Sequence, residues 1–190
     1  MKNSGRIIWL TGLSGSGKST LASLLQISFL AANNECLLLD GDEVRKNLSK
    51  GLGFSKEDRD ENVRRIGYVA NQVASCGKDV IIAAISPYRE TRNELKLKYN
   101  NFIEVYIKAN LATCKARDPK GLYKKVQLGE IKNFTGIDDP YEEPTEPDIL
   151  IETEKMNVVN SFIKLCDGIS SVSMLIDTAK KCVNNIMFNK

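Results

Sequence analysis

The sequence predicts a three-layer α/β fold in which a mainly parallel sheet of five strands carries helices on both faces. Short apolar runs alternate along the chain with longer stretches of helical periodicity, and this alternation is typical of parallel sheets. A glycine-rich turn separates the first apolar run from the first helical stretch. Because the carboxyl ends of parallel strands bind ligands, polar residues that follow the apolar runs are the first candidates for a functional site.

The expected strands are short apolar runs, and the expected helices lie between them. Strands are predicted at 7–10, 36–40, 79–85, 103–107 and 148–152, and helices at 18–32, 57–76 and 89–99. The stretch 57–76 carries apolar side chains at helical spacing, namely Val63, Ile66, Val69, Ala70 and Val73. All of these elements fit a single domain that spans residues 1–190.

The C-terminal stretch, residues 156–190, reads as a helical extension of that domain. Its apolar positions fit two helices, the first with Val158, Phe162 and Ile163 and the second with Leu175, Ile176, Ala179 and Val183. The residues 167–171 predict a break between the two helices. Extra packing or a subunit contact are the roles that the pattern allows.

The composition excludes several classes of function. The chain has 190 residues, 42% of them hydrophobic, and no apolar run of 18 or more, so we expect a soluble domain without a membrane partner. The formal net charge of +3 is too small to indicate a nucleic-acid partner. Residues 1–6 lead directly into the first strand and leave no room for a targeting segment, so we expect a cytoplasmic location.

Cysteine and histidine usage narrows the chemistry further. The five cysteines form no CxxC pair, which favours reduced and mostly buried thiols over metal ligands or disulfides: Cys36, Cys76, Cys114, Cys166 and Cys182. The chain contains no histidine. Any general base is therefore a carboxylate, a perturbed lysine or the substrate itself.

The most specific motif is the sequence GLSGSGKST at residues 12–20, which matches the phosphate-binding pattern GxxxxGK(S/T) between a predicted strand and a predicted helix. In this pattern backbone N–H groups surround a polyphosphate, Lys18 reaches its outer phosphates and the Ser19 hydroxyl ligates Mg²⁺. The predicted ligands are therefore a polyphosphate and Mg²⁺, held by Gly12, Leu13, Ser14, Gly15, Ser16, Gly17, Lys18, Ser19 and Thr20.

Two carboxylates follow the second predicted strand, in the sequence Asp40-Gly41-Asp42. Asp42 is placed to accept a proton from an attacking hydroxyl or to help hold Mg²⁺, and Asp40 to orient the waters of the metal. The alternative is a simple turn with a helix cap.

An aromatic residue and a helix with polar residues at spacings of three follow this turn. Phe54 is suited to stack on a base, and Arg59 to donate paired hydrogen bonds to a phosphate or sulfate. Asn62 lies on the same predicted helix face as Arg59. The alternatives are a core phenylalanine and a solvated arginine.

Ser86 follows the third predicted strand, directly after Ile85. Its hydroxyl is a candidate to bind substrate or to accept phosphate transiently, although a turn or cap serine is an equal alternative. Residues 117–140 are basic, aromatic and punctuated by glycine, which predicts a lid that excludes water and stacks Phe134 opposite Phe54. The alternative for this segment is a charged, solvated helix.

These segments, in this order, resemble the adenylyl-sulfate kinase family, which uses ATP to phosphorylate the 3′-hydroxyl of adenosine 5′-phosphosulfate (APS). The resemblance covers roughly residues 5–152 and the motifs GLSGSGKST, DGDEVRKNL at 40–48, GLGFS at 51–55, ISPYR at 85–89, KGLYKK at 120–125 and KNFTGIDDPYE at 132–142. It implies the three-layer P-loop kinase fold, a role in sulfate assimilation, and a homodimer.

The resemblance also implies roles for individual residues. Catalytic roles fall to Lys18, Asp42 and Ser86, the last as a proposed phosphoserine, and the metal ligands are Ser19 and Asp42. Arg117 is placed near the ATP adenine. The substrate-binding residues are Asp40, Arg45, Phe54, Arg59, Asn62, Ile85, Ser86, Lys120, Lys132 and Phe134, in which Arg45 and Arg59 grip the phosphosulfate and the two phenylalanines sandwich the adenine.

Two other functions share the phosphate-binding motif. A kinase for another small hydroxyl compound, such as gluconate or a nucleoside, does not call for paired aromatic residues with paired arginines. A nucleotide-gated switch of the GTPase kind is disfavoured because the chain has no NKxD motif to read guanine.

Overall fold

The computed structural model describes residues 4–169, and its centre is a five-stranded, all-parallel sheet with the strand order β2-β3-β1-β4-β5. The strands are β1 Ile7–Thr11, β2 Cys36–Asp40, β3 Asp79–Ala83, β4 Phe102–Lys108 and β5 Ile149–Glu152. The predicted sheet is therefore confirmed. The third strand ends at Ala83, two residues earlier than expected, and beyond it the Ile85 carbonyl oxygen accepts a hydrogen bond from the Thr11 hydroxyl.

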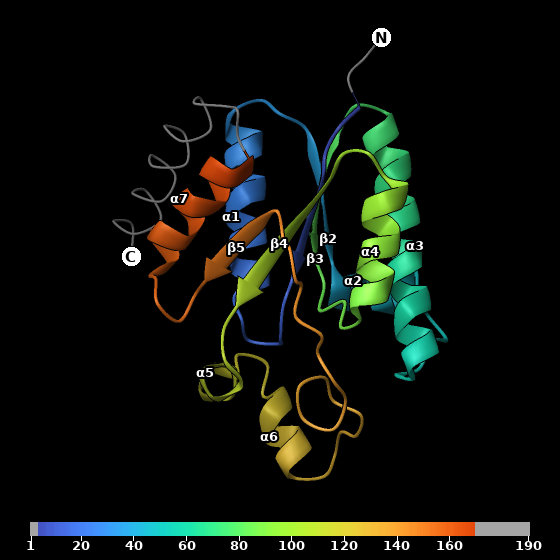
Figure 1. Cartoon of the computed structure of the whole chain (residues 1–190), viewed down its shortest axis with the longest axis vertical. Helices are drawn as coiled ribbons and strands as arrows, with labels where there is room; N and C mark the ends of the chain where they lie inside the picture. Colours follow the sequence, from blue (N-terminus) through green and yellow to red (C-terminus); the bar gives the residue numbers. More distant parts are fainter. Residues whose placement is uncertain (1–3, 170–190) are drawn as a thin grey trace.

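Helices cover both faces of the sheet, as predicted. They are α1 Lys18–Ala31, α2 Gly41–Asn47, α3 Lys56–Ser75, α4 Arg89–Lys98, α5 Leu111–Arg117, α6 Leu122–Gln127 and α7 Val158–Ile169. Figure 1 shows α1 and α7 on one face and α3 and α4 on the other, while α5 and α6 lie beyond the carboxyl ends of the strands. This end of the sheet is where ligands bind in folds of this class.

The central strand β1 separates two hydrophobic cores. Ile8 and Leu10 pack with α1 and α7, whereas Ile7 and Trp9 pack with α3 and α4. This alternation follows from the two-residue period of a strand, and all four side chains are buried because both faces are covered. The indole of Trp9 also stacks on Phe102, with ring centroids 5.5 Å apart.

Helix α7 confirms the first of the two predicted C-terminal helices, but it extends further than expected. It continues through 167–169, where a break was predicted, because Leu165, Cys166 and Ile169 lie in the core beside α1. Gly168 serves close packing here, since a Cβ at this position would lie 2.7 Å from Cδ1 of Ile149. The predicted second helix lies outside the described residues.

Two exclusions made from composition can be compared with the described part of the chain. In residues 4–169, no helix is long and apolar enough to cross a membrane. Cys36, Cys76, Cys114 and Cys166 are free thiols, of which Cys76 is exposed and the other three are wholly or partly buried; Cys182 lies outside the described residues.

Candidate active site

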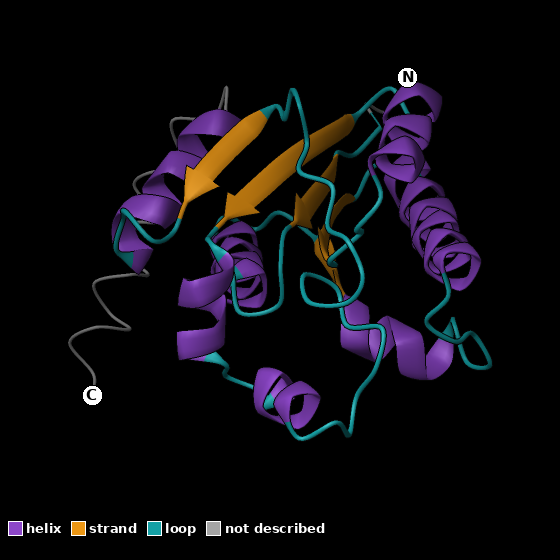
Figure 2. Ribbon diagram, turned by 60° about the horizontal axis from the view of Figure 1, so that its bottom comes forward, coloured by secondary structure: helices purple, strands orange, loops and turns teal. Residues whose placement is uncertain are grey.

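A cavity of about 840 Å³ opens at the carboxyl ends of the strands, and nearly all the predicted site residues line it. The exceptions are Gly12, Leu13 and Ser16 of the phosphate-binding loop, which lie behind the loop surface. Figure 2 shows α2, α5 and α6 arranged around this end of the sheet. Residues that are distant in the sequence are thus brought to one cavity. This follows the strand-end rule, by which ligands bind at the carboxyl ends of parallel strands.

The phosphate-binding loop needs glycine where neighbouring backbone approaches it. Gly12 has a φ of 147°, and a Cβ there would lie 2.4 Å from the carbonyl oxygen of Ile107. Gly15 has a φ of 76°, and its Cβ would lie 2.9 Å from the carbonyl oxygen of Cys114. The loop is therefore held between β4 and α5 in a conformation that side chains would disrupt.

Lys18 lies inside the loop, with only 8% of its surface exposed. Its Nζ donates hydrogen bonds to the carbonyl oxygens of Gly12 and Leu13, at 2.9 and 2.8 Å. Burial disfavours the charged ammonium and lowers the pKa of Lys18 to about 8. Gly17 precedes α1 without a side chain to cap it, so the N–H groups of the first turn remain suited to an anion.

The two carboxylates after β2 have different surroundings. Asp40 caps α2 by accepting a hydrogen bond from the Asp42 N–H, and its other oxygen accepts one from the Ser19 hydroxyl at 2.9 Å. Asp42 is exposed and forms an ion pair with Lys120 from the segment between α5 and α6. The cap that was considered as an alternative is thus real, and it places a carboxylate beside the metal-binding hydroxyl rather than excluding that use.

The ion pair with Asp42 also determines the charge state of Lys120. Burial lowers the pKa of Lys120, but the hydrogen bond and charge of Asp42, with a smaller contribution from Asp40, raise it above its usual value overall. Lys120 therefore stays a cation that faces the carboxylate edge of the cavity.

Phe54 lines the same cavity as the phosphate-binding loop and is 55% exposed, so the alternative of a core phenylalanine is wrong. Two guanidinium groups lie near its ring, Arg45 at 4.6 Å and Arg59 at 5.5 Å from the centroid. Arg45 also donates to the Gly53 carbonyl at 2.8 Å. One face of an aromatic ring and two cations are thus gathered in one place, which suits a nucleotide with anionic groups.

Arg59 is buried rather than solvated, and it connects α3 to the lid. Its guanidinium donates to the carbonyl oxygen of Phe54 at 3.0 Å, to Oγ1 of Thr135 at 2.9 Å and to the carbonyl oxygen of Asn133. The Asp139 carboxylate lies 3.5 Å from its Nε. In this structure Arg59 therefore orders the loop that carries Lys132 and Phe134.

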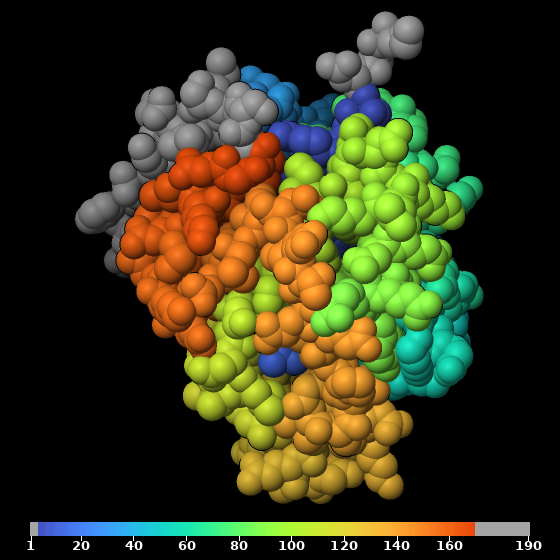
Figure 3. All heavy atoms as spheres, in the orientation of Figure 1, coloured from blue at the N-terminus to red at the C-terminus, as the bar shows by residue number. Residues whose placement is uncertain are grey.

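Residues 117–140 form a compact cover over this end of the molecule, drawn in yellow and gold in Figure 3. Phe134 is 9% exposed and packs edge-on against Tyr123, with ring centroids 5.1 Å apart. Asp138 accepts hydrogen bonds from the backbone N–H groups of Asn133 and Phe134. The segment packs into a small hydrophobic core that it shares with α5 and the phosphate-binding loop, so the alternative of a solvated helix does not describe it.

Two further buried polar residues, Asn62 and Ser86, line the cavity. Asn62 is 7% exposed, and its Oδ1 has no hydrogen-bond partner among the described residues. Ser86 is 3% exposed and has a φ of 48°. Its Oγ accepts a hydrogen bond from Nε1 of Trp9 at 2.9 Å. Ile85 and Lys132 also line the cavity, Lys132 as an exposed side chain.

Sequence reasoning missed Thr153 and Tyr123. The Thr153 hydroxyl donates to the Ser16 carbonyl at 2.7 Å and accepts from Arg117 at 3.0 Å, and the Tyr123 hydroxyl donates to the Ser14 carbonyl at 2.9 Å. Both side chains therefore brace the back of the phosphate-binding loop. Thr153 directly follows β5, so the strand-end rule would have identified it, whereas Tyr123 lies within the KGLYKK motif and gave no separate signal.

Comparisons with known proteins agree with this geometry. The model of the adenylylsulphate kinase family matches residues 4–152. An adenylyl-sulfate kinase from Microcystis aeruginosa is 50% identical over 175 residues, which are 92% of this chain and 97% of the relative. Another, from Oceanobacillus iheyensis, is 53% identical over 157 residues, 82% of this chain and 79% of the relative.

Solved structures give the same assignment. An APS kinase from Mycobacterium tuberculosis, determined in complex with AMPPNP and APS, superposes with a TM-score of 0.77 at 37% identity over 97% of this chain and 98% of its own. A gluconokinase from Sinorhizobium meliloti, 15% identical over the whole of this chain and 99% of its own, has a TM-score of 0.54 and shares only the fold. The family match and the relatives at about half identity show that this chain belongs to the adenylyl-sulfate kinase family.

Proposed function

We propose that this protein transfers the terminal phosphoryl group of ATP to the 3′-hydroxyl of APS, which yields 3′-phosphoadenosine 5′-phosphosulfate and ADP. The observation that carries the proposal is a single cavity with two different sides in a chain of this family. One side has the phosphate-binding loop, and the other has an exposed ring flanked by two guanidinium groups. Such a cavity suits two nucleotides placed end to end.

On the donor side, the loop backbone and the start of α1 bind the ATP phosphates, and Lys18 stabilises the negative charge of the transferred group. In the structure the Lys18 ammonium, which the loop encloses, donates to the carbonyl oxygens of Gly12 and Leu13. It exchanges these two partners for the phosphate when ATP binds. Arg117 lies beside the loop, where Thr153 holds it. We therefore assign the ATP base to the surface that Arg117 and Thr153 form.

A magnesium ion fits the oxygen-rich edge where the loop meets β2. The Ser19 hydroxyl and the Asp40 carboxylate already lie within hydrogen-bond distance, and Asp42 follows two residues later. Mg²⁺ takes few protein ligands and prefers oxygen, so Ser19 with one of these carboxylates, directly or through water, is sufficient beside the phosphates. Bound there, Mg²⁺ would neutralise phosphate charge. Asp40 is therefore a candidate ligand of the ion in addition to Asp42.

Asp42 is our candidate for the group that accepts the proton of the attacking hydroxyl. The carboxylate is exposed to the cavity, and no histidine exists in the chain to take this role. Its partner Lys120 comes from the lid, so closure of the lid and placement of the base are coupled. This arrangement favours transfer to the acceptor over hydrolysis, since the base is in place when water is excluded.

On the acceptor side, Phe54 stacks on the APS adenine, and Arg45 meets its anionic groups. Asn62 supplies a buried amide with a free acceptor. Arg59 and Phe134 act through the lid in the structure, and they reach substrate if the lid loop moves. Assembly into a homodimer remains a prediction from the family resemblance; a related structure is a hexameric APS kinase from Thiobacillus denitrificans.

The decisive experiment measures ADP formation from ATP and Mg²⁺ with APS as the acceptor. We expect ADP to form only when APS is present, and far more slowly with adenosine 5′-monophosphate or gluconate. Turnover of these compounds at the rate of APS would contradict the proposal.

The same assay tests the assignment of the base. Asp42→Asn should lower kcat by at least about a hundredfold with a smaller effect on the KM for APS, because proton acceptance operates in the transition state. Glu43→Gln, an exposed neighbour on the same helix, is the matched control and should keep normal turnover. Normal kcat in Asp42→Asn would remove Asp42 from this role.

A further inference from the structure

Ser86 has a strained backbone that the proposed reaction does not by itself explain. Its φ of 48° lies in the left-handed region, which a non-glycine residue adopts at a cost, and the next residue is Pro87. Strain of this kind persists only where the surroundings impose it, and it occurs preferentially at functional sites. Ser86 lines the cavity, three residues after the end of β3 at Ala83.

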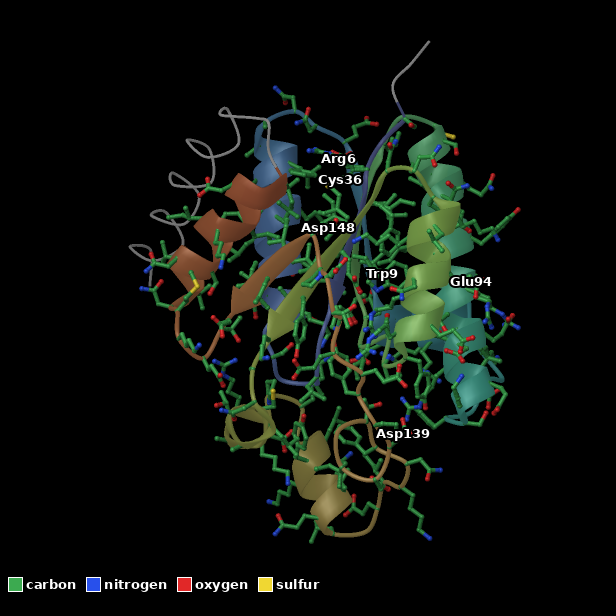
Figure 4. All side chains as sticks on the ribbon, viewed as in Figure 1. Arg6, Trp9, Cys36, Glu94, Asp139 and Asp148 are labelled. Atoms are coloured by element: carbon green, nitrogen blue, oxygen red, sulfur yellow. The ribbon has the colours of Figure 1, made fainter. Side chains whose placement is uncertain are left out.

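Two buried side chains impose this conformation. Nε1 of Trp9 donates to Oγ of Ser86 at 2.9 Å, and Nη1 of Arg92 donates to the Ser86 carbonyl oxygen. Arg92 is itself fixed, because its Nε pairs with Glu104 at 2.8 Å and its Nη2 donates to the Glu142 carbonyl oxygen at 2.6 Å. Figure 4 shows Trp9 between the sheet and α4, away from solvent.

The bond from Trp9 restricts what the Ser86 hydroxyl can do. An indole N–H is only a donor, so the hydroxyl oxygen must accept from it, and the hydroxyl proton is left for another acceptor. Within residues 4–169, no carboxylate contacts Ser86 Oγ to remove that proton. A hydroxyl in this state is suited to donate a hydrogen bond and is not activated for attack on phosphate.

We infer that Trp9 is a positioning residue that acts through Ser86, and that it directs the Ser86 hydroxyl as a hydrogen-bond donor to an oxygen of the acceptor nucleotide. Arg92 supports the same residue from its backbone side. This inference rests on the proposed function, since the acceptor nucleotide is APS. It gives a reason for a tryptophan in the middle of β1.

Trp9→Phe tests the inference most directly. This change keeps a ring against Phe102 and removes the N–H donor. One hydrogen bond contributes modestly, so we expect the KM for APS to rise by about two- to tenfold, with the KM for ATP unchanged. Ser86→Gly removes the hydroxyl while tolerating the left-handed backbone, and it should raise the KM for APS by at least as much.

The double variant distinguishes positioning from general packing. If Trp9 acts through Ser86, Trp9→Phe in the Ser86→Gly background should cause no further rise in the KM for APS. Phe102→Leu is the packing control, because it disturbs the ring next to Trp9 but leaves the hydrogen bond. We expect it to lower the melting temperature without changing the KM for APS.

Three results would overturn the inference: an unchanged KM for APS in Trp9→Phe, additive effects in the double variant, or an equal KM shift in Phe102→Leu. Each presupposes a wild-type enzyme that transfers phosphate to APS. A wild-type protein without APS-dependent ADP formation would instead contradict the proposed function. The two failures are therefore told apart by the wild-type assay alone.

Discussion

The donor and acceptor sides of the cavity are built in different ways. The donor side comes mostly from one continuous segment, residues 12–20, whose backbone forms the binding surface. The acceptor side is assembled from side chains in separate segments, which the chain brings together from 40–62, 85–86 and 132–135. A short motif thus specifies polyphosphate binding almost alone, whereas recognition of the acceptor depends on how distant elements meet.

This difference predicts where substitutions act. Changes on the donor side should weaken the stabilisation of negative charge on the transferred phosphoryl group and so lower kcat, because the loop contacts the reacting phosphates. Changes on the acceptor side should affect APS affinity or the order of the lid, because its side chains are held by Arg59 and by the small core around Tyr123.

The largest expected effect is on the donor side. Lys18→Ala removes the cation that the loop encloses, and we expect kcat to fall by about a hundred- to a thousandfold, because a preorganised charge at the transferred group is lost. A steady-state assay with saturating ATP and APS measures this. Lys115→Ala, an exposed lysine on α5, is the control and should behave as wild type. A fall of less than tenfold would mean that charge at this position matters little.

On the acceptor side, substitution of the two aromatic residues should have different effects, one on APS affinity and the other on stability. Phe54→Ala should weaken APS binding by about fivefold to about a hundredfold through loss of base stacking, with little change in stability, because the ring is exposed. Phe134→Ala should lower the free energy of unfolding by about 3 kcal/mol, because its ring packs on Tyr123. Calorimetric titration with APS and thermal unfolding of both variants measure the contrast, and equal destabilisation would contradict it.

The buried lysine predicts a pH dependence that is specific to the donor side. Burial lowers the pKa of Lys18 to about 8, so the ligand-free protein loses this cation as the pH rises through that value. We expect kcat/KM for ATP to fall by about tenfold per pH unit above pH 8, since kcat/KM reports the free enzyme. A flat profile up to pH 10 would contradict this assignment, and Lys18→Arg, which does not titrate here, should lose the inflection.

The same group has an opposite effect on folding. Its pKa is lower in the folded chain than in the unfolded chain, so between pH 8 and the usual pKa of lysine the unfolded state binds more protons. The contribution of Lys18 to stability therefore becomes more favourable as the pH rises through this range. ATP affinity should weaken there while this part of the unfolding free energy increases.

The smallest effect is expected at Thr153, which braces the loop from behind. Thr153→Val keeps the shape of the side chain but loses the bonds to Ser16 and Arg117, so the KM for ATP should rise by about two- to tenfold. The KM for APS should not change if the two sides are independent. Thr113→Val on α5 is the matched control, and an equal change in both KM values would show that the sides are coupled.

Much of the fold was accessible from the sequence because its signals are local. The run Ile7–Leu10 reads as a buried strand whichever neighbours it has, and Gly12 to Ser19 form a turn that needs glycine for its own backbone. The strand-end rule then placed Asp42 and Ser86 at one cavity. The predicted helix break was wrong at residues 167–169, which continue α7, since glycine marks close packing as well as chain reversal; residues 170 and 171 lie outside the described residues.

The sequence by itself determined the sheet, the phosphate-binding loop and the family, because these depend on periodicity and on contiguous residue types. Only the tertiary structure decided that Arg59 orders the lid, that Thr153 braces the loop and that Trp9 holds Ser86. Each of these is a hydrogen bond between residues more than 70 positions apart. The physical reason is that such partners are selected by geometry at a shared edge of the sheet, which no local pattern encodes.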